Sequence, residues 1–289
     1  MEPIIGSIEH TILYRKIGLD KKDKKINGGK QMKKSQTILG TVLLSTMVLT
    51  ALPTHSFAAT KDFNTTGKVQ FSEPTSPVDP LDPEQPEKEK PVVPENPGTP
   101  TTGPLSIDFA SSLDFGQITN EKPANNATVL KGFAKGQVLT TGMTGSEETV
   151  ANYVQVTDHR SLNASDQPKG WKLSVKQVGN FKYSTLDDLG TGTKITFNKA
   201  KIENEKNNNS TTPSVVKNSF EIQPGTSQKV VGAKVGEGWD TWTYHFGTKS
   251  TAAKSIELEV PYSEAKTAIP EKTYQTSIVW TIDDTPENP

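Results

Sequence analysis

From Leu105 almost to its end, the chain consists of short runs of alternating or β-branched residues, separated by clusters of Gly, Pro, Asn and Ser. Runs at this spacing are typical of strands joined by tight turns. No stretch keeps an apolar stripe at helical spacing over several turns. The pattern predicts an all-β domain over residues 105–289, built as an antiparallel β-sandwich or a distorted barrel. The expected strands are LSIDFA, LDFGQ, YVQVTD, WKLSVKQV, KITFN, FEIQ, QKVVGA, WDTWTYHF, SIELEV and YQTSIVWTI.

Residues 32–58 have the pattern of a secretory signal peptide. Lys33 and Lys34 are followed by an apolar core at 38–52 and by a small-x-small cleavage site at 56–58. Gly and Thr interrupt the core, which falls short of the about 20 apolar residues that a membrane-spanning helix needs. We therefore predict that the protein is exported and cleaved, and that no membrane span remains after processing.

Residues 1–31 precede this signal and need a separate explanation. The stretch 28–31, directly before Met32, can be encoded as a purine-rich ribosome-binding site. One interpretation is therefore that Met32 is the true start and that residues 1–31 are an untranslated leader. The alternative is that they extend the basic region of the signal peptide.

Residues 59–104 are predicted to be a disordered linker rich in proline and acidic residues. From Ser72 to Pro104, Pro recurs every few residues among Glu, Asp, Lys and Thr, with little apolar surface to bury. Such a segment stays extended and semi-rigid. The composition favours a spacer, and a proline-motif ligand is the alternative.

Charge and cysteine content exclude several classes of protein. Residues 1–58 hold nine of the 32 basic and four of the 33 acidic residues, so residues 59–289 carry a net charge of −6. This balance argues against a nucleic-acid partner, which needs clustered Lys and Arg. Because the chain has no cysteine, it has no disulfide, no thiolate chemistry and no cysteine for lipid attachment.

Side chains suited to catalysis are scarce after the signal peptide. His159 and His245 are the histidines of this part, and neither an HExxH nor a GxSxG motif is present. The acidic doublets at 147–148, 187–188 and 283–284 are poor carboxylate pairs for glycoside cleavage, because adjacent residues of a strand face opposite ways. We therefore expect no enzyme activity, no metal and no cofactor.

Two motifs place a Trp two residues before a branched aliphatic residue: Trp171 before Leu173, and Trp280 before Ile282. In a strand, both members of each pair point to the same face. The alternatives are a core role, a contact surface that stacks on a sugar or peptide, and a mixed arrangement with one Trp buried and the other at a rim. Trp239 is expected to face solvent, because it follows flexible glycines.

The run VQVTDHR ends in two charged residues that share one side, Asp158 and Arg160. We expect them to form a bidentate ion pair that closes the following loop. A turn-fixing pair is the favoured interpretation, and contact with a ligand is the alternative. Asp158, Arg160 and Trp239 are therefore candidate accessory contacts.

Five segments follow one another along the chain: LSIDFASSLDFG, VQVTDHR followed by GWKLSVKQ, GTSQKVVGAKVGEGWDTWTYHFG, ELEVP, and YQTSIVWTIDDTP. In order and spacing they resemble the WxL-domain cell-surface proteins of low-GC Gram-positive bacteria. The resemblance covers everything after Met32. One departure is Ile282, which stands where the family motif has Leu; it keeps the apolar character and alters the shape of the side chain.

The resemblance implies a secreted protein held non-covalently to the cell wall, through peptidoglycan, by its C-terminal domain. Trp171, Leu173, Trp280 and Ile282 would form or support the contact surface. The final residues contain no sorting signal for covalent anchoring, which agrees with this expectation. Companion cell-surface proteins, and in some members the host extracellular matrix, are implied as further partners. The alternative function is therefore a subunit of a surface complex, or a host-matrix adhesin, held to the wall through a companion protein.

Overall fold

The fold is that of a computed structural model, which describes residues 61–88, 90–141, 145–185, 187–205 and 210–288. The predicted leader and signal peptide lie outside these residues. Residues 67–289 form one compact unit, and the unit before it is described only at 61–66, which are exposed and form no strand. The compact unit is nearly all β, as the sequence predicts, and every strand pair in it is antiparallel.

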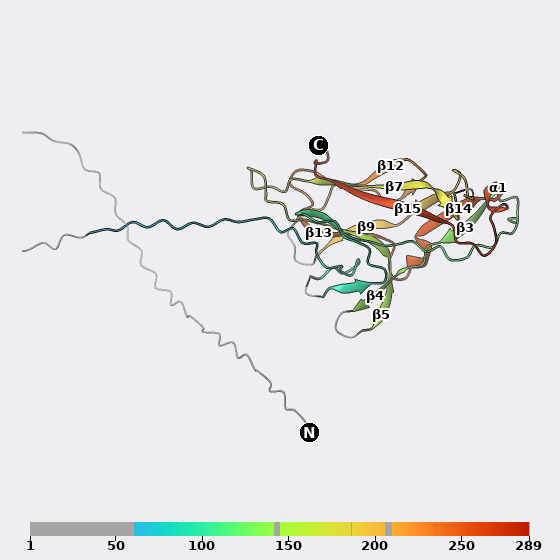
Figure 1. The fold of residues 1–289 in the computed structure, drawn as a ribbon, viewed down its shortest axis with the longest axis horizontal. Helices are drawn as coiled ribbons and strands as arrows, with labels where there is room; N and C mark the ends of the chain where they lie inside the picture. The colour runs from blue at the N-terminus through green and yellow to red at the C-terminus, as the bar shows by residue number, and fades with distance from the viewer. Residues whose placement is uncertain (1–60, 89, 142–144, 186, 206–209, 289) are drawn as a thin grey trace, which may run out of the picture. The chain divides into compact units, whose positions relative to one another are not determined.

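The strands form one three-stranded and three four-stranded sheets (Figure 1). The small sheet consists, in hydrogen-bonded order, of β1 (Val92–Pro94), β4 (Gln137–Thr141) and β5 (Glu147–Val150). A second sheet consists of β2 (Leu105–Ala110), β6 (Asn152–Asp158), β13 (Asp240–Phe246) and β9 (Ala200–Asn204). A third consists of β11 (Phe220–Ile222), β8 (Lys194–Phe197), β14 (Ile256–Pro261) and β3 (Val129–Phe133). The fourth consists of β10 (Val215–Val216), β12 (Ser227–Ala233), β7 (Trp171–Lys182) and β15 (Gln275–Asp283). Two short helices, η1 (Ala252–Lys254) and α1 (Tyr262–Ala265), flank β14.

The three larger sheets enclose one apolar core, which makes the domain a distorted barrel. The sheet of β7 contributes Trp171, the sheet of β13 contributes Phe246, and the sheet of β8 contributes Phe197. The alternation along β7 is the one that the sequence predicts: every second residue from Trp171 to Gln177 is buried. Such a one-sided row is what an antiparallel sheet with one buried face requires.

Strands β6 and β13 are buried along their whole length. One face of their sheet lies on the main core. The other face carries a second apolar cluster with the small sheet, where Phe109 and Tyr153 pack at 4.6 Å between ring centroids beside Leu139. Because both faces are covered, these strands carry almost no solvent-exposed residue, unlike the half-buried strands that alternation alone predicts.

Part of the predicted linker is ordered, which corrects the expectation of a disordered segment from 59 to 104. Leu81 is 1% exposed and its N–H donates to Gln155 Oε1 at 2.8 Å. Gln155 Nε2 donates to the carbonyl of Asp79, and Thr243 Oγ1 to that of Pro83. A proline-rich segment has few N–H groups of its own, but its carbonyls accept from polar side chains of β6 and β13. The segment around Leu81 has the composition of a linker but packs on the sheet of β6 and β13.

The strand predictions also differ from the structure in detail. LDFGQ forms no strand; Leu113 and Phe115 pack against the core from an irregular segment instead. The sequence does not predict the strands β1, β3, β4, β5, β9 and β10, because they are short and their alternation is broken by charged or small residues.

Candidate functional site

The two Trp motifs lie side by side on neighbouring strands. β7 and β15 pair antiparallel, with Leu173 opposite Ile282 and Val175 opposite Trp280. Residues directly opposite each other point to the same face of a sheet. Both motifs, which are far apart in the sequence, therefore contribute to one apolar row on the inner face of this sheet.

Trp171 and Leu173 belong to the core. Both side chains are 0% exposed. The indole Nε1 of Trp171 donates a 2.7 Å hydrogen bond to the carbonyl oxygen of Gly238, so its one polar group is satisfied inside the protein. A ligand cannot reach either side chain in this conformation.

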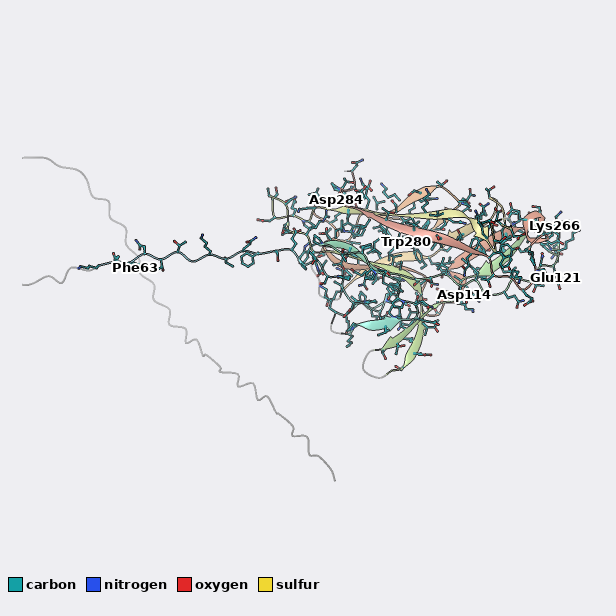
Figure 2. The ribbon with its side chains drawn as sticks, viewed as in Figure 1. Phe63, Asp114, Glu121, Lys266, Trp280 and Asp284 are labelled. Atoms are coloured by element: carbon teal, nitrogen blue, oxygen red, sulfur yellow. The ribbon has the colours of Figure 1, made fainter. Side chains whose placement is uncertain are left out.

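Trp280 and Ile282 are half-buried. The two motif tryptophans therefore have the mixed arrangement, in which Trp171 is buried and Trp280 lies at the rim of the core. Trp280 lies midway along β15, and Asp284 follows the end of the strand (Figure 2). The indole of Trp280 stacks on Phe246 at 6.2 Å and meets Phe197 edge-on at 6.1 Å. Within the described part of the chain its indole N–H has no hydrogen-bond partner. One side of Trp280 thus closes the core and another reaches solvent.

The loop before β13 is held by both buried tryptophans. Gly238 accepts from Trp171, and the indole N–H of Trp242 donates to the carbonyl of Trp239 at 3.0 Å. Gly238 has φ of +73°, and a Cβ built there would lie 2.6 Å from Ala233 Cβ and 2.7 Å from Trp171 Nε1. Only glycine fits such a position. The motif Trp171 therefore fixes the backbone of the residue that precedes Trp239.

Trp239 itself faces solvent, as its sequence context predicts, with 36% of the residue exposed, whereas Trp242 is 1% exposed. Its ring lies 6.3 Å from that of His159. His159 Nε2 is 2.9 Å from Asp240 Oδ1, and Lys88 Nζ is 2.5 Å from the same oxygen. We call Trp239, His159, Asp240 and Lys88 the Trp239 surface.

The charges of the Trp239 surface are strongly coupled. Burial alone would raise the pKa of Asp240, but hydrogen bonds from His159 and Lys88 outweigh burial and lower that pKa to about 2. The pKa of Lys88 is raised, because its bonds to Asp240 and to Glu205 outweigh its own burial. Asp240 is therefore a carboxylate at neutral pH, and the exposed ring stands beside a fixed network of hydrogen-bonding groups.

Asp158 and Arg160 form the predicted bidentate pair. Arg160 Nε donates to Asp158 Oδ1 and Nη2 to Oδ2, both at 2.8 Å. The guanidinium also donates to the carbonyls of Gly170, at 2.6 Å, and Asp284, at 3.1 Å. These carbonyls lie just before β7 and just after β15. Arg160 thus joins the ends of both motif strands, an arrangement that supports its turn-fixing interpretation.

The residues of the described ranges offer no cluster of His, Asp and Glu suited to a metal ion. Nor does any helix within those ranges have the length and apolar character to cross a membrane.

Sequence reasoning missed most of the Trp239 surface. The sequence gives His159 no role beyond being one of few histidines, and it places Lys88 in the predicted linker. Asp240 directly follows Trp239, but its partners come from residues 81 and 152 positions away in the chain. No local sequence pattern predicts such long-range contacts. The one signal in the sequence was the charge of Asp240 within the aromatic-rich run WDTWTYHF.

Comparison with known proteins adds one finding. The family model described as "WxL domain surface cell wall-binding" matches residues 58–286. No curated protein and no solved structure is significantly similar to the chain. The matched range includes both Trp motifs, the Trp239 surface and the ordered part of the predicted linker.

Proposed function

This chain belongs to the WxL family of surface cell wall-binding domains, and we propose that it binds peptidoglycan directly, non-covalently, through the Trp239 surface. The observation that carries the proposal is the bond from the buried motif Trp171 to Gly238, which fixes the backbone beside the exposed Trp239. In this proposal Trp171 and Leu173 support the contact surface, and the exposed ring makes the contact.

The chemistry of the Trp239 surface suits a glycan strand with peptide stems. An exposed indole offers a flat apolar face on which a sugar ring stacks, and its N–H is a donor for a polar partner. Within the described residues the N–H of Trp239 has no partner. His159 lies beside the ring, and Lys88 shares Asp240 with it; both carry N–H groups that can bond sugar hydroxyls and stem carboxylates.

The test is co-sedimentation of residues 59–289 with sacculi freed of protein and of attached wall polymers. Wild type is expected in the pellet, and Trp239→Ala in the supernatant although it still unfolds in one cooperative thermal transition. Tyr183→Ala is the matched control, because Tyr183 is an exposed aromatic residue, at 43%, on another part of the domain. That variant should sediment like wild type.

A Trp239→Ala variant that sediments with the sacculi as wild type does would overturn the role of this surface. If wild type itself pellets only after a companion surface protein is added, attachment is indirect, and the protein is a subunit of a surface complex. The adhesin alternative is tested by measuring the binding of wild type and of Trp239→Ala to immobilised host matrix proteins in the same way.

A further inference from the structure

The outer face of the sheet of β12, β7 and β15 is open to solvent. Val178 of β7 is 50% and Val279 of β15 is 44% exposed. Both alternate along their strands with residues that face the core, so they belong to the outer face. Figure 1 shows the three strands along one side of the domain.

Three lysines and two hydroxyl groups meet on this outer face. Ser174 of β7 stands opposite Lys229 of β12 on one side and opposite Thr281 of β15 on the other. Lys172 and Lys176 precede and follow Ser174 by two residues. Opposite residues, and every second residue of a strand, point to the same face. We call these five residues the lysine face.

The lysines of this face are only partly compensated. Lys172 Nζ donates to Thr285 Oγ1 at 3.0 Å, which is a neutral partner. The side chain of Lys176 has no hydrogen bond or ion pair within the described part of the chain. The two residues lie about 7 Å apart along β7, and like charges at such a distance repel each other. An anion between them would remove that repulsion.

The C-terminal tail of the chain places a carboxylate at one end of the lysine face. Glu287 Oε2 lies 2.5 Å from Lys229 Nζ, and the N–H of Glu287 donates to the carbonyl of Ala233 at 2.9 Å. A Cβ built at Gly232, which stands opposite Lys172, would overlap this carboxylate. The pKa of Glu287 is lowered, mainly by the hydrogen bond from Lys229 and also by the charge of Lys172. The tail therefore shows that this face holds an anion.

The side chains of the outer face favour a charged ligand over a neutral sugar. The outward residues of 172–178 on β7 and of 277–283 on β15 are Lys, Ser, Val, Thr and Asp, with no aromatic ring on which a sugar could stack. Ammonium and hydroxyl groups are side chains that bind phosphate oxygens. A phosphodiester polymer offers such oxygens at every repeat, as a row of lysines along a strand requires.

We propose that the lysine face binds a phosphodiester polymer attached to the cell wall, and that the C-terminal tail competes with this polymer at Lys229. The net charge of residues 59–289 is −6. At physiological ionic strength, however, charges farther away than about 8 Å are largely screened, so the nearby lysines decide the contact. The inference goes beyond peptidoglycan binding, because it assigns a second wall ligand to residues that the Trp239 surface does not contain.

Titration calorimetry of residues 59–289 with deacylated poly(glycerol phosphate), over a series of salt concentrations, tests the proposal. For wild type, the logarithm of the association constant should fall with the logarithm of the salt concentration with a slope of about −2, as three neutralised phosphates of a single strand require. Lys172→Gln/Lys176→Gln should lose about tenfold in affinity and reduce the slope to about −0.7.

The matched control is Lys122→Gln/Lys266→Gln, which removes the same charge from two exposed lysines. Lys266 lies at the far end of the domain from Asp284, where the tail begins (Figure 2). This control should bind the polymer like wild type. Equal loss of affinity in the two double variants would overturn the proposal, because overall charge and not the lysine face would then decide binding.

Two further variants test the competition by the tail. Glu287→Gln removes the competing carboxylate, and Gly232→Ala displaces it without a change in charge. Both should bind the polymer about two- to fivefold more tightly than wild type, a gain that a misfolded variant cannot produce. If neither binds more tightly, the tail does not compete and that part of the proposal is wrong.

The outcome is separable from that of peptidoglycan binding. Trp239→Ala should bind poly(glycerol phosphate) like wild type, and Lys172→Gln/Lys176→Gln should sediment like wild type with sacculi freed of attached polymers. The absence of polymer binding in wild type and in Gly232→Ala alike would overturn the proposal and leave peptidoglycan binding untouched. A loss of polymer binding in Trp239→Ala would overturn it as well, because the polymer would then lie on the Trp239 surface.

Discussion

The indole nitrogen of Trp171 lies 2.7 Å from the carbonyl oxygen of Gly238, across 67 residues of chain. This bond joins the first Trp motif to the loop that presents Trp239. It gives the motif a physical role that differs from direct contact: the buried ring fills the core with its apolar part and fixes a surface loop with its polar atom. In the function proposed above, stability and wall binding are therefore coupled through one side chain.

Replacing the buried and the exposed tryptophan should separate these effects. Trp171→Ala leaves a cavity and an unpaired carbonyl, and we expect it to lower the free energy of unfolding by about 3–5 kcal/mol. Trp239→Ala removes a ring that is 36% exposed and should lower that free energy by a smaller amount, about 1 kcal/mol. Urea unfolding followed by circular dichroism measures both. Equal destabilisation by the two substitutions would contradict the assignment of one ring to the core and the other to the surface.

Gly238→Ala should lower the free energy of unfolding more than Gly225→Ala does, although both glycines have a positive φ. Gly225 also has a positive φ, of +86°, but a Cβ there would meet no atom within 4 Å, whereas one at Gly238 would overlap Ala233 and Trp171. We expect Gly225→Ala to cost about 1–2 kcal/mol from backbone strain alone. Gly238→Ala should cost about 1–3 kcal/mol more through overpacking. Thermal unfolding compares them, and a Gly238→Ala variant as stable as Gly225→Ala would argue against the close contact with Trp171.

Arg160 should matter far more than an ion pair at the surface. Asp158 is 1% exposed, and Arg160→Met would leave this carboxylate buried without its partner. We expect a loss of about 3–5 kcal/mol in unfolding free energy. Lys135→Met breaks an exposed pair with Asp114 and should cost far less, because solvent screens that pair. If chemical denaturation finds the two losses equal, Arg160 does not hold the ends of β7 and β15 as the geometry indicates.

The sequence is most informative where a local pattern decides the structure. Alternation in WKLSVKQV predicts the buried face of β7, and the spacing of Asp158 and Arg160 predicts their pair, because both depend on neighbours in the chain. The burial of Trp171 against the partial exposure of Trp280 is not predictable in this way. The two motifs have the same spacing, and the difference arises because β7 is an inner strand of its sheet while β15 is an edge.

The ordered part of the predicted linker also depends on long-range contacts that the sequence does not predict. Composition indicates that residues 59–104 have little apolar surface to bury. Yet Leu81 is buried, because Gln155 and Thr243 provide hydrogen-bonding partners for the surrounding segment from strands far along the chain. Lys88 reaches the Trp239 surface from this segment for the same reason. Long-range pairing of polar groups leaves no periodic signal in the sequence.

Acid should weaken the protein through Asp240. The pKa of this carboxyl group lies at about 2, below its usual 3.8, because hydrogen bonds from His159 and Lys88 outweigh the effect of burial. A lowered pKa in the folded state stabilises the protein above the ordinary pKa, and this contribution is lost as pH falls toward the folded value. We expect wild type to exceed Asp240→Asn in unfolding free energy by about 2 kcal/mol near neutral pH, and the difference to disappear near about pH 2.

The Asp240→Asn substitution suits this measurement because the residue has φ of +74°, a left-handed conformation that Asn tolerates as well as Asp does. Urea unfolding at a series of pH values gives the two stability curves. Asp62→Asn serves as the control, since Asp62 is exposed and belongs to no strand, and its curve should follow that of wild type throughout. A wild-type advantage over Asp240→Asn that stays constant down to low pH would show that the carboxylate charge is not what His159 and Lys88 stabilise.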